Sequence, residues 1–200
     1  MKTPPACTFD NENGKHEYRI GGSVVSSVTQ IVGDVLPGFK ADPWYLERGR
    51  AVHECYAFLA RSEKFECDKV CEPYVEAWHK WRDAVQPRFI SIERRVYSVK
   101  YRFAGTMDLL ARINDTAVIV DYKSSLDARI IWQLAGYAIA LEEEGGIKVD
   151  HGYGVQLSED EKFKSTPLLE LKRAKREFLS MLTVHNLRTR LGINTKKEQE

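Results

Sequence analysis

Long apolar runs and a large net charge are both missing from this sequence. No stretch approaches the ~18 consecutive apolar residues that a membrane span needs. The N-terminal segment MKTPPACTFDNENGKHEY has no apolar core of the kind that signal peptides contain. The net charge is +1, so no global positive field attracts polyanions, although a local basic groove is still compatible with nucleic-acid binding. We therefore expect a cytoplasmic protein with no membrane partner.

Cysteine is also scarce, with four residues in 200. They are Cys7, Cys55, Cys67 and Cys71, and no Cys-x-x-Cys motif occurs among them. A metal or iron–sulfur site would have to recruit Cys7 from a distant polar segment as its fourth ligand. Because disulfides are rare in a reducing compartment, we expect these residues to be structural thiols.

What is present is an ordinary globular composition, with 43% apolar and 30% charged residues and no repeat. A chain of 200 residues is expected to form one domain. We expect a core over about 18–157, with flexible segments at 1–15 and 191–200. The predicted element order is helices, three strands, helix, strand and helix. This order favours an α/β fold in which a central mixed sheet has helices on both faces.

Turn and capping residues predict the bounds of the elements. Gly21-Gly22 predicts a turn between two short strands within 16–25. Asp42 and Pro43 predict the start of a helix that ends near residue 61. Other helices are expected over about 27–34, 69–86, 128–144 and 167–190, of which 69–86 carries a tryptophan stripe typical of core. Other strands are expected over about 89–99, 101–113, 116–122, 149–157 and 161–165.

The central feature of the sequence is the stretch 103–123, FAGTMDLLARINDTAVIVDYK, which predicts a β-hairpin. Asn114-Asp115 separates two apolar runs, and both residue types tolerate the left-handed backbone of a tight turn. If these two residues form the turn, the numbers of opposed residues sum to 229, and Asp108 faces Asp121. Opposed like charges destabilise a strand pair, and Lys123 leaves the same face as Asp121. A β-bulge would shift this pairing by one residue.

Two carboxylates and a lysine at a buried strand end are typical of a divalent cation site. Mg²⁺ and Mn²⁺ prefer carboxylate and carbonyl oxygens, and the backbone carbonyl of Tyr122 would complete the ligand set. Lys123 would orient or deprotonate the attacking water and neutralise a scissile phosphate. The alternative is a solvated hairpin end, which the continuous apolar run Val118–Val120 disfavours.

Four motifs occur in a fixed order along the chain. They are Arg48-Gly49-x-x-Val52-His53, Gly105-x-x-Asp108, Asp121-x-Lys123 and Gln133-x-x-x-Tyr137. Together they resemble the PD-(D/E)XK nuclease superfamily, and in particular its RecB-like and phage-exonuclease branch. Ser27-Val28-Thr29 and Tyr74-x-x-Ala77-Trp78 also match, so the resemblance covers about residues 18–157. The C-terminal cysteines of the iron–sulfur members of this branch are absent, and no iron–sulfur cluster is expected.

The resemblance implies a restriction-endonuclease-like core with named catalytic residues. Asp108 and Asp121 would bind Mg²⁺ or Mn²⁺, and Lys123 would position the attacking water. His53 would be a metal ligand or a phosphate contact, with a packed helix residue as the alternative. Glu93 would lie near the metal, but two arginines follow it, so a salt-bridged strand residue is the alternative.

Other candidates are expected to contact DNA or to support the site. Gln133 and Tyr137 lie four residues apart and share a helix face, so they are expected to position DNA or support the site. Arg48 and Arg50 flank the histidine motif, and a DNA contact is expected for both. Lys172 and Arg173 on the last helix are candidates for a contact with the phosphate backbone, and a solvated helix face is the favoured alternative. Trp44 and Tyr45 are candidates for stacking on bases, and core packing is the favoured alternative.

The predicted function is a metal-dependent deoxyribonuclease, an exonuclease that acts in DNA recombination, repair or phage DNA processing. The resemblance implies single- or double-stranded DNA ends as substrate, a bacterial or phage-infected cytoplasm, and an oligomer or a recombination protein as a further partner. One alternative is a catalytically silent nucleic-acid-binding or assembly module, which the intact acid–acid–lysine set disfavours. Another is a site-specific endonuclease, which usually needs more chain for reading base edges.

Overall fold

A mixed β-sheet forms the centre of the protein, seen in a computed structural model that describes residues 6–10, 17–38, 42–145 and 147–193. The strands of the described residues are β1 (Cys7–Asp10), β2 (Glu17–Ile20), β3 (Ser23–Ser27), β4 (Arg88–Ser98), β5 (Phe103–Ile113), β6 (Thr116–Lys123), β7 (His151–Leu157), β8 (Phe163–Ser165) and β9 (Leu169–Glu170). Their order is β1-β2-β3-β5-β6-β7-β8, with β4 also paired to β5 and β9 to β7. The β3–β5 and β6–β7 pairs are parallel and the others antiparallel.

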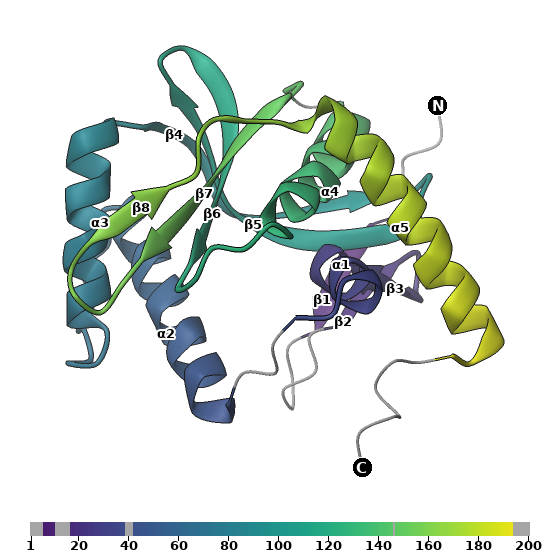
Figure 1. The fold of residues 1–200 in the computed structure, drawn as a ribbon, viewed down its shortest axis with the longest axis horizontal. Coiled ribbons are helices and arrows are strands. Elements are labelled where there is room, and N and C mark those ends of the chain that lie inside the picture. Colours follow the sequence, from purple (N-terminus) through teal and green to yellow (C-terminus); the bar gives the residue numbers. More distant parts are fainter. Residues whose placement is uncertain (1–5, 11–16, 39–41, 146, 194–200) are drawn as a thin grey trace.

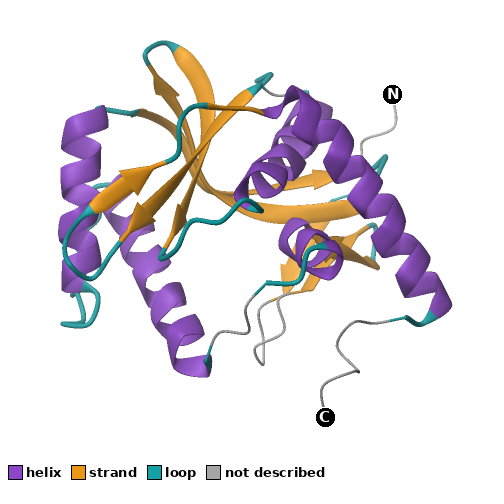
Figure 2. Ribbon diagram, viewed as in Figure 1, coloured by secondary structure: helices purple, strands orange, loops and turns teal. Residues whose placement is uncertain are grey.

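Helices cover both faces of this sheet (Figure 1). They are α1 (Val28–Val35), α2 (Pro43–Ala60), α3 (Glu72–Val85), α4 (Ile130–Glu143) and α5 (Leu171–Leu191). One core lies between the sheet and α1, α4 and α5, and a second lies between the sheet and α2 and α3. Figure 2 shows these layers by element type. The predicted fold class, a mixed sheet with helices on both faces, is confirmed.

The hairpin has the predicted register. The β5–β6 pairs run from Ile113 opposite Thr116 to Leu109 opposite Val120, and every pair sums to 229. Asn114 and Asp115 form the turn with φ values of 47° and 61°. The tryptophan stripe is core as predicted, since Trp78 and Trp81 are fully buried against the sheet. Within the described residues, no helix has both the length and the apolarity to cross a bilayer.

Several predicted helix starts are wrong, because turns precede these helices. The helix predicted from 69 begins at Glu72, since the carbonyl of Asp68 accepts the N–H groups of Cys71 and Glu72 in a turn. The helix predicted from 128 begins at Ile130, after a turn in which Asp127 accepts the N–H of Arg129. The helix predicted from 167 begins at Leu171, because 169–170 pairs with β7 instead.

Further predicted bounds differ at the strands, and those predicted from 149 and from 161 begin at His151 and Phe163. Residues 1–15 were expected to be flexible, yet Cys7–Asp10 pairs with Glu17–Ile20 and extends the sheet. The rest of 1–15 and the tail from 194 lie outside the described residues. The strand predicted from 101 begins at Phe103, because the N–H of Arg102 bonds to the carbonyl of Ser98 in a turn. These corrections leave the elements that carry the predicted site unchanged.

Candidate active site at the open end of the hairpin

The site begins where β5 and β6 stop pairing. The last cross-strand pair joins Leu109 to Val120, one position before Asp108 and Asp121. There, the backbone N–H of Tyr122 donates to Asp108 Oδ2 over 2.7 Å. Strand β6 continues beside β7, where Asp121 lies opposite Gly154. Beyond the last backbone pair, the carboxylate of Asp108 therefore links the two strands through a hydrogen bond from side chain to backbone.

Asp121 is buried, with 1% of its side chain exposed. Its Oδ1 accepts a hydrogen bond of 2.7 Å from Gln133 Nε2, which also donates to the Tyr137 hydroxyl over 3.0 Å. Its Oδ2 lies in ion-pair contact with Lys123 Nζ but receives no hydrogen bond of normal geometry from the described residues. Burial raises the pKa of Asp121 to about 6, although the charge of Lys123 opposes this rise. A buried carboxylate oxygen is thus left short of donors.

The glycine of the Gly105-x-x-Asp108 motif makes room for the Tyr137 ring. A Cβ at Gly105 would lie 2.7 Å from Tyr137 Cε1. Such a distance is too short for two carbon atoms without a shift of the ring. The glycine therefore leaves space for the Tyr137 ring, whose hydroxyl accepts a hydrogen bond from Gln133. Gln133 in turn donates to Asp121.

His53 reaches Asp108 from α2 on the opposite face of the sheet. His53 Nδ1 lies 3.4 Å from Asp108 Oδ1. Burial alone would lower the pKa of His53, but the adjacent Asp108 outweighs burial and raises it. For Asp108, burial would raise the pKa, but His53, Lys123 and the Tyr122 N–H together lower it. Asp108 is therefore ionised and surrounded by donors.

Glu93 completes a three-residue cluster with His53 and Asp108. One ligand atom from each of the three residues lies within 4.8 Å of the other two. Glu93 lies between two β4–β5 pairs, Ile92 with Leu109 and Arg94 with Met107, which places it opposite Asp108. Burial, and next the charge of Asp108, raise the pKa of Glu93 to about 7.

The backbone of Glu93 has a φ of 46°, in the left-handed region. For a residue with a Cβ, this conformation raises the free energy of the folded state by roughly 1–2 kcal/mol. Such strain is characteristic of sites where surrounding packing enforces an unusual side-chain direction. The salt-bridge alternative for Glu93 finds no support in the neighbouring arginines, because Arg94 pairs with Glu144 and Arg95 lies over the Phe9 ring.

This donor set fits a hard divalent cation. Two carboxylates and an imidazole lie within 4.8 Å of one another, and the buried Asp121 Oδ2 has the Lys123 ammonium beside it. Oxygen-rich sets of this kind suit Mg²⁺ and Mn²⁺. Asp121 is not part of the group whose ligand atoms lie within 4.8 Å of one another. That group consists of His53, Glu93 and Asp108. The role of the Tyr122 carbonyl stays a prediction, since the Tyr122 contact to Asp108 is made by its N–H.

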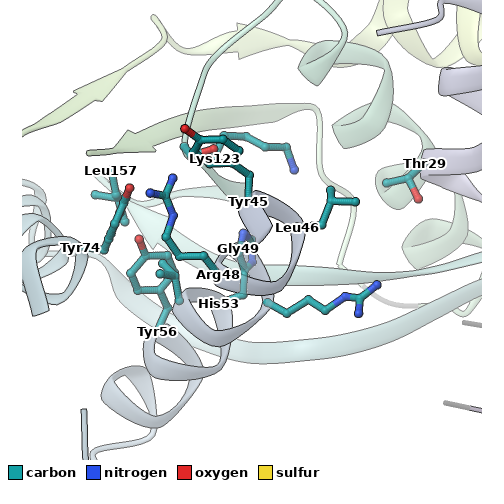
Figure 3. A pocket seen from close by; sticks show the side chains of 13 residues that line it. Thr29, Tyr45, Leu46, Arg48, Gly49, His53, Tyr56, Tyr74, Lys123 and Leu157 are labelled. Atoms are coloured by element: carbon teal, nitrogen blue, oxygen red, sulfur yellow. The ribbon is translucent and has the colours of Figure 1, made fainter. Parts of the chain in front are cut away.

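A cleft of about 540 Å³ opens beside these residues (Figure 3). His53 and Lys123 line it, together with Arg48 and Arg50 from α2. The other lining residues are Thr29, Tyr45, Leu46, Gly49, Val52, Tyr56, Tyr74, Ser124 and Leu157. The cleft thus joins the acidic site to the arginines for which a DNA contact was predicted.

The structure does not bring every predicted residue to this cleft. Lys172 and Arg173 lie at the start of α5, directly after β9. Strand β9 pairs with the His151 end of β7, whereas Lys123 lies opposite Gln156, near the other end of β7. Arg173 also forms an ion pair with Glu177 at 2.6 Å. Neither residue lines the cleft.

Sequence reasoning missed the contacts that surround Arg48. Tyr45 and Tyr74, which the sequence had already singled out, lie against its guanidinium group, and Glu159, which it had not, lies 3.6 Å from it. Glu159 gave no signal in the sequence, since it lies in a polar connection after β7.

Together, the fold and the site define a class of protein: an α/β/α sandwich with acidic residues and a lysine at the end of its central hairpin. A family model of the PD-(D/E)XK nuclease superfamily matches residues 39–178. The chain therefore belongs to the PD-(D/E)XK nuclease superfamily, as the sequence motifs predicted. No curated protein matched the sequence.

Among solved structures, the chain is similar to a candidate exonuclease from Eubacterium rectale, with 12% identity and a TM-score of 0.49, covering 81% of this chain and 74% of that one. It is also similar to the alkaline exonuclease LHK-Exo from Laribacter hongkongensis, with 13% identity and a TM-score of 0.41, covering 84% and 93%. The LHK-Exo complex with dAMP gives 14% identity and a TM-score of 0.40, with the same coverages.

Proposed function

We propose that this protein is a Mg²⁺- or Mn²⁺-dependent exodeoxyribonuclease that hydrolyses phosphodiester bonds during DNA recombination, repair or phage DNA processing. The observation that carries the proposal is the placement of Asp108, Asp121 and Lys123 at the open end of one hairpin. Membership of a nuclease superfamily supports the same reaction class. The site opens into a cleft with two arginines, which suits a polyanionic substrate.

Asp108, Asp121 and Glu93 would hold the metal ion, with His53 and the Tyr122 carbonyl as further ligands. When bound, the ion would lower the pKa of water and stabilise the charge that develops on the phosphate. Gln133 donates to Asp121 Oδ1 and so fixes the plane of that carboxylate. Its second contact, to Tyr137, fixes Gln133 itself.

Lys123 would act as a cation rather than as a base. Burial would lower its pKa, but the charges of Asp121 and Asp108 outweigh burial and raise it. The ammonium group therefore keeps its proton at neutral pH, and it can donate hydrogen bonds to the attacking water and to a phosphate oxygen. Of the two roles toward the attacking water that the sequence left open, orienting the water is favoured over deprotonating it.

The substrate would enter along the cleft. Arg48 and Arg50 would contact phosphates, whereas Lys172 and Arg173 would contribute only to a longer DNA path over α5.

The catalytically silent module remains the second candidate. The observation that disfavours it is Asp121, a buried acid that costs stability and has no structural use beyond its contacts to Lys123 and Gln133.

The test is incubation of the purified protein with linear duplex, closed circular and single-stranded DNA, in Mg²⁺, Mn²⁺ or EDTA. We expect metal-dependent degradation of linear DNA, which Asp121→Ala and Lys123→Ala abolish while Lys148→Ala, at an exposed lysine, leaves it intact. Cleavage of closed circles would replace the exonuclease assignment by an endonuclease. DNA binding without cleavage under all conditions would favour the silent module.

A further inference from the structure

Two aromatic side chains stand out on the surface of the protein. Trp44 and Tyr45 in the first turn of α2 are 51% and 55% exposed. Every other aromatic residue in the described ranges is buried or half-buried. The sequence favoured a core role for both residues, and the structure contradicts that interpretation. The reason is that α2 begins beyond the sheet, so its first turn has no core to cover it.

Arg48 holds the two rings in place. Its guanidinium carbon lies 4.8 Å from the Trp44 ring centroid, 5.0 Å from that of Tyr45 and 5.1 Å from that of Tyr74. The Trp44 and Tyr45 rings meet edge to face at 5.0 Å. Only 12% of the Arg48 side chain is exposed, and Glu159 pairs with it. The exposed rings are therefore pre-positioned, so less entropy is lost when they bind a ligand.

The aromatic pair is continuous with the candidate active site. Tyr45 and Arg48 line the same cleft as His53 and Lys123, and Figure 3 shows Arg48 between Tyr45 and Tyr74. A strand with one phosphate at the acidic site would pass Tyr45 within that cleft, and Trp44 contacts both Tyr45 and Arg48. Aromatic rings beside basic residues are the usual composition of single-strand binding grooves.

We propose that Trp44 and Tyr45 form a stacking platform for unpaired bases of the DNA strand that is being cut. This inference rests on the proposed function and adds to it that the nucleotides at the site are single-stranded. Paired bases already stack on their neighbours, so only an unpaired base presents a free face to a protein ring. The two arginines and Lys123 in the cleft complement the phosphates of a nucleic-acid strand, and an apolar protein partner would leave these charges unmatched.

The test separates stacking from charge by removing bases without removing phosphates. Binding of fluorescent single-stranded oligonucleotides is measured by anisotropy in EDTA, with ordinary strands and with strands that carry abasic sites. Stacking is worth about 1–3 kcal/mol per base, so the wild-type protein is expected to bind the abasic strand about fivefold to 150-fold more weakly. The double variant Trp44→Leu/Tyr45→Leu keeps apolar bulk but is expected to lose this preference. The matched variant Trp44→Phe/Tyr45→Phe keeps both rings and is expected to retain it.

Equal binding of the two strands by the wild-type protein would overturn the inference, as would a leucine variant that keeps the preference. A wild-type dimer that the leucine variant cannot form would also overturn it, in favour of a second copy on these rings. The leucine and phenylalanine variants must both match the wild type in thermal unfolding, which excludes misfolding as the cause of a lost preference. Metal-dependent cleavage of linear DNA by the wild-type protein would leave the proposed function standing even if the two strands bound equally, so the two failures are distinguishable.

Discussion

The backbone N–H of Tyr122 donates to the Asp108 carboxylate over 2.7 Å at the point where the two strands of the hairpin separate. One side chain thus closes the strand pair and presents a second oxygen to His53. The two uses draw on different oxygens of Asp108, Oδ2 for the backbone and Oδ1 for His53. Structural and chemical roles of this residue can therefore be separated by substitution.

Asp108→Asn is expected to preserve the fold and to abolish metal-dependent cleavage, because the amide keeps a carbonyl oxygen for the Tyr122 N–H but loses the charge. Asp108→Ala is expected to lose activity and also about 1–3 kcal/mol of unfolding free energy, since it leaves a buried N–H unpaired. Urea denaturation of both variants measures the difference. Equal stability of the two variants would show that the hydrogen bond does not hold the strand ends.

The sequence was most informative where local chemistry determines structure. Asn114-Asp115 can adopt left-handed backbone, and its place between two apolar runs predicted the hairpin register. The pairing ends with Leu109 and Val120, one position before the predicted pair of Asp108 and Asp121. The spacing of Gln133 and Tyr137 predicted a shared helix face, and Gln133 indeed donates both to Asp121 and to the Tyr137 hydroxyl. In these cases the deciding interactions lie within a few residues of one another in the chain.

The sequence was less informative where distant contacts decide. The left-handed backbone of Glu93 is enforced by the strands and helices around it, and no residue preference signals it. The exposure of Trp44 depends on where α2 projects past the sheet, which a helical pattern does not record. The late start of α5 depends on pairing of Leu169 with Gly152 of β7. Each of these features follows from tertiary placement.

Gln133→Leu is expected to weaken metal binding and cleavage about 10–100-fold, the usual effect of removing a residue that orients a ligand. The reason is that Asp121 Oδ1 loses the donor at 2.7 Å. Calorimetric titration with Mn²⁺ and cleavage rates at saturating DNA measure the effect. Gln156→Leu is the matched control, because Gln156 donates to the Ser124 carbonyl and has no contact with Asp121. A Gln133→Leu protein with wild-type metal affinity would remove Gln133 from the site.

Metal stabilisation is expected to increase with pH. Without metal, burial raises the pKa of Asp121 to about 6 and that of Glu93 to about 7. Protons on these carboxyls stabilise the metal-free fold fully below about pH 4, and this contribution is lost as the pH rises through 6 and 7. Mn²⁺ must displace those protons at acidic pH, so saturating Mn²⁺ should raise the Tm less at pH 5.5 than at pH 8.

Differential scanning fluorimetry with Mn²⁺ and with EDTA across this range measures the effect. Glu93→Gln removes the carboxyl with the higher pKa and is expected to move the midpoint of the metal effect toward the pKa of Asp121. A Tm increase that is constant from pH 5.5 to pH 8 would mean that neither carboxyl binds the metal.

Gly105→Ala is expected to destabilise the protein by about 1–3 kcal/mol and to reduce cleavage, because overpacking forces a neighbour to move. The added Cβ would lie 2.7 Å from Tyr137 Cε1, and a shifted Tyr137 no longer holds Gln133 against Asp121. Gly33→Ala is the matched control: no atom lies within 4 Å of a Cβ there, and it lies inside α1. That substitution should stabilise by about 0.5–1 kcal/mol and leave cleavage unchanged. Chemical denaturation and cleavage rates are measured for both variants. If the Tyr137 ring only fills the core, Gly105→Ala will lower the stability of the protein but not the cleavage rate of its folded form.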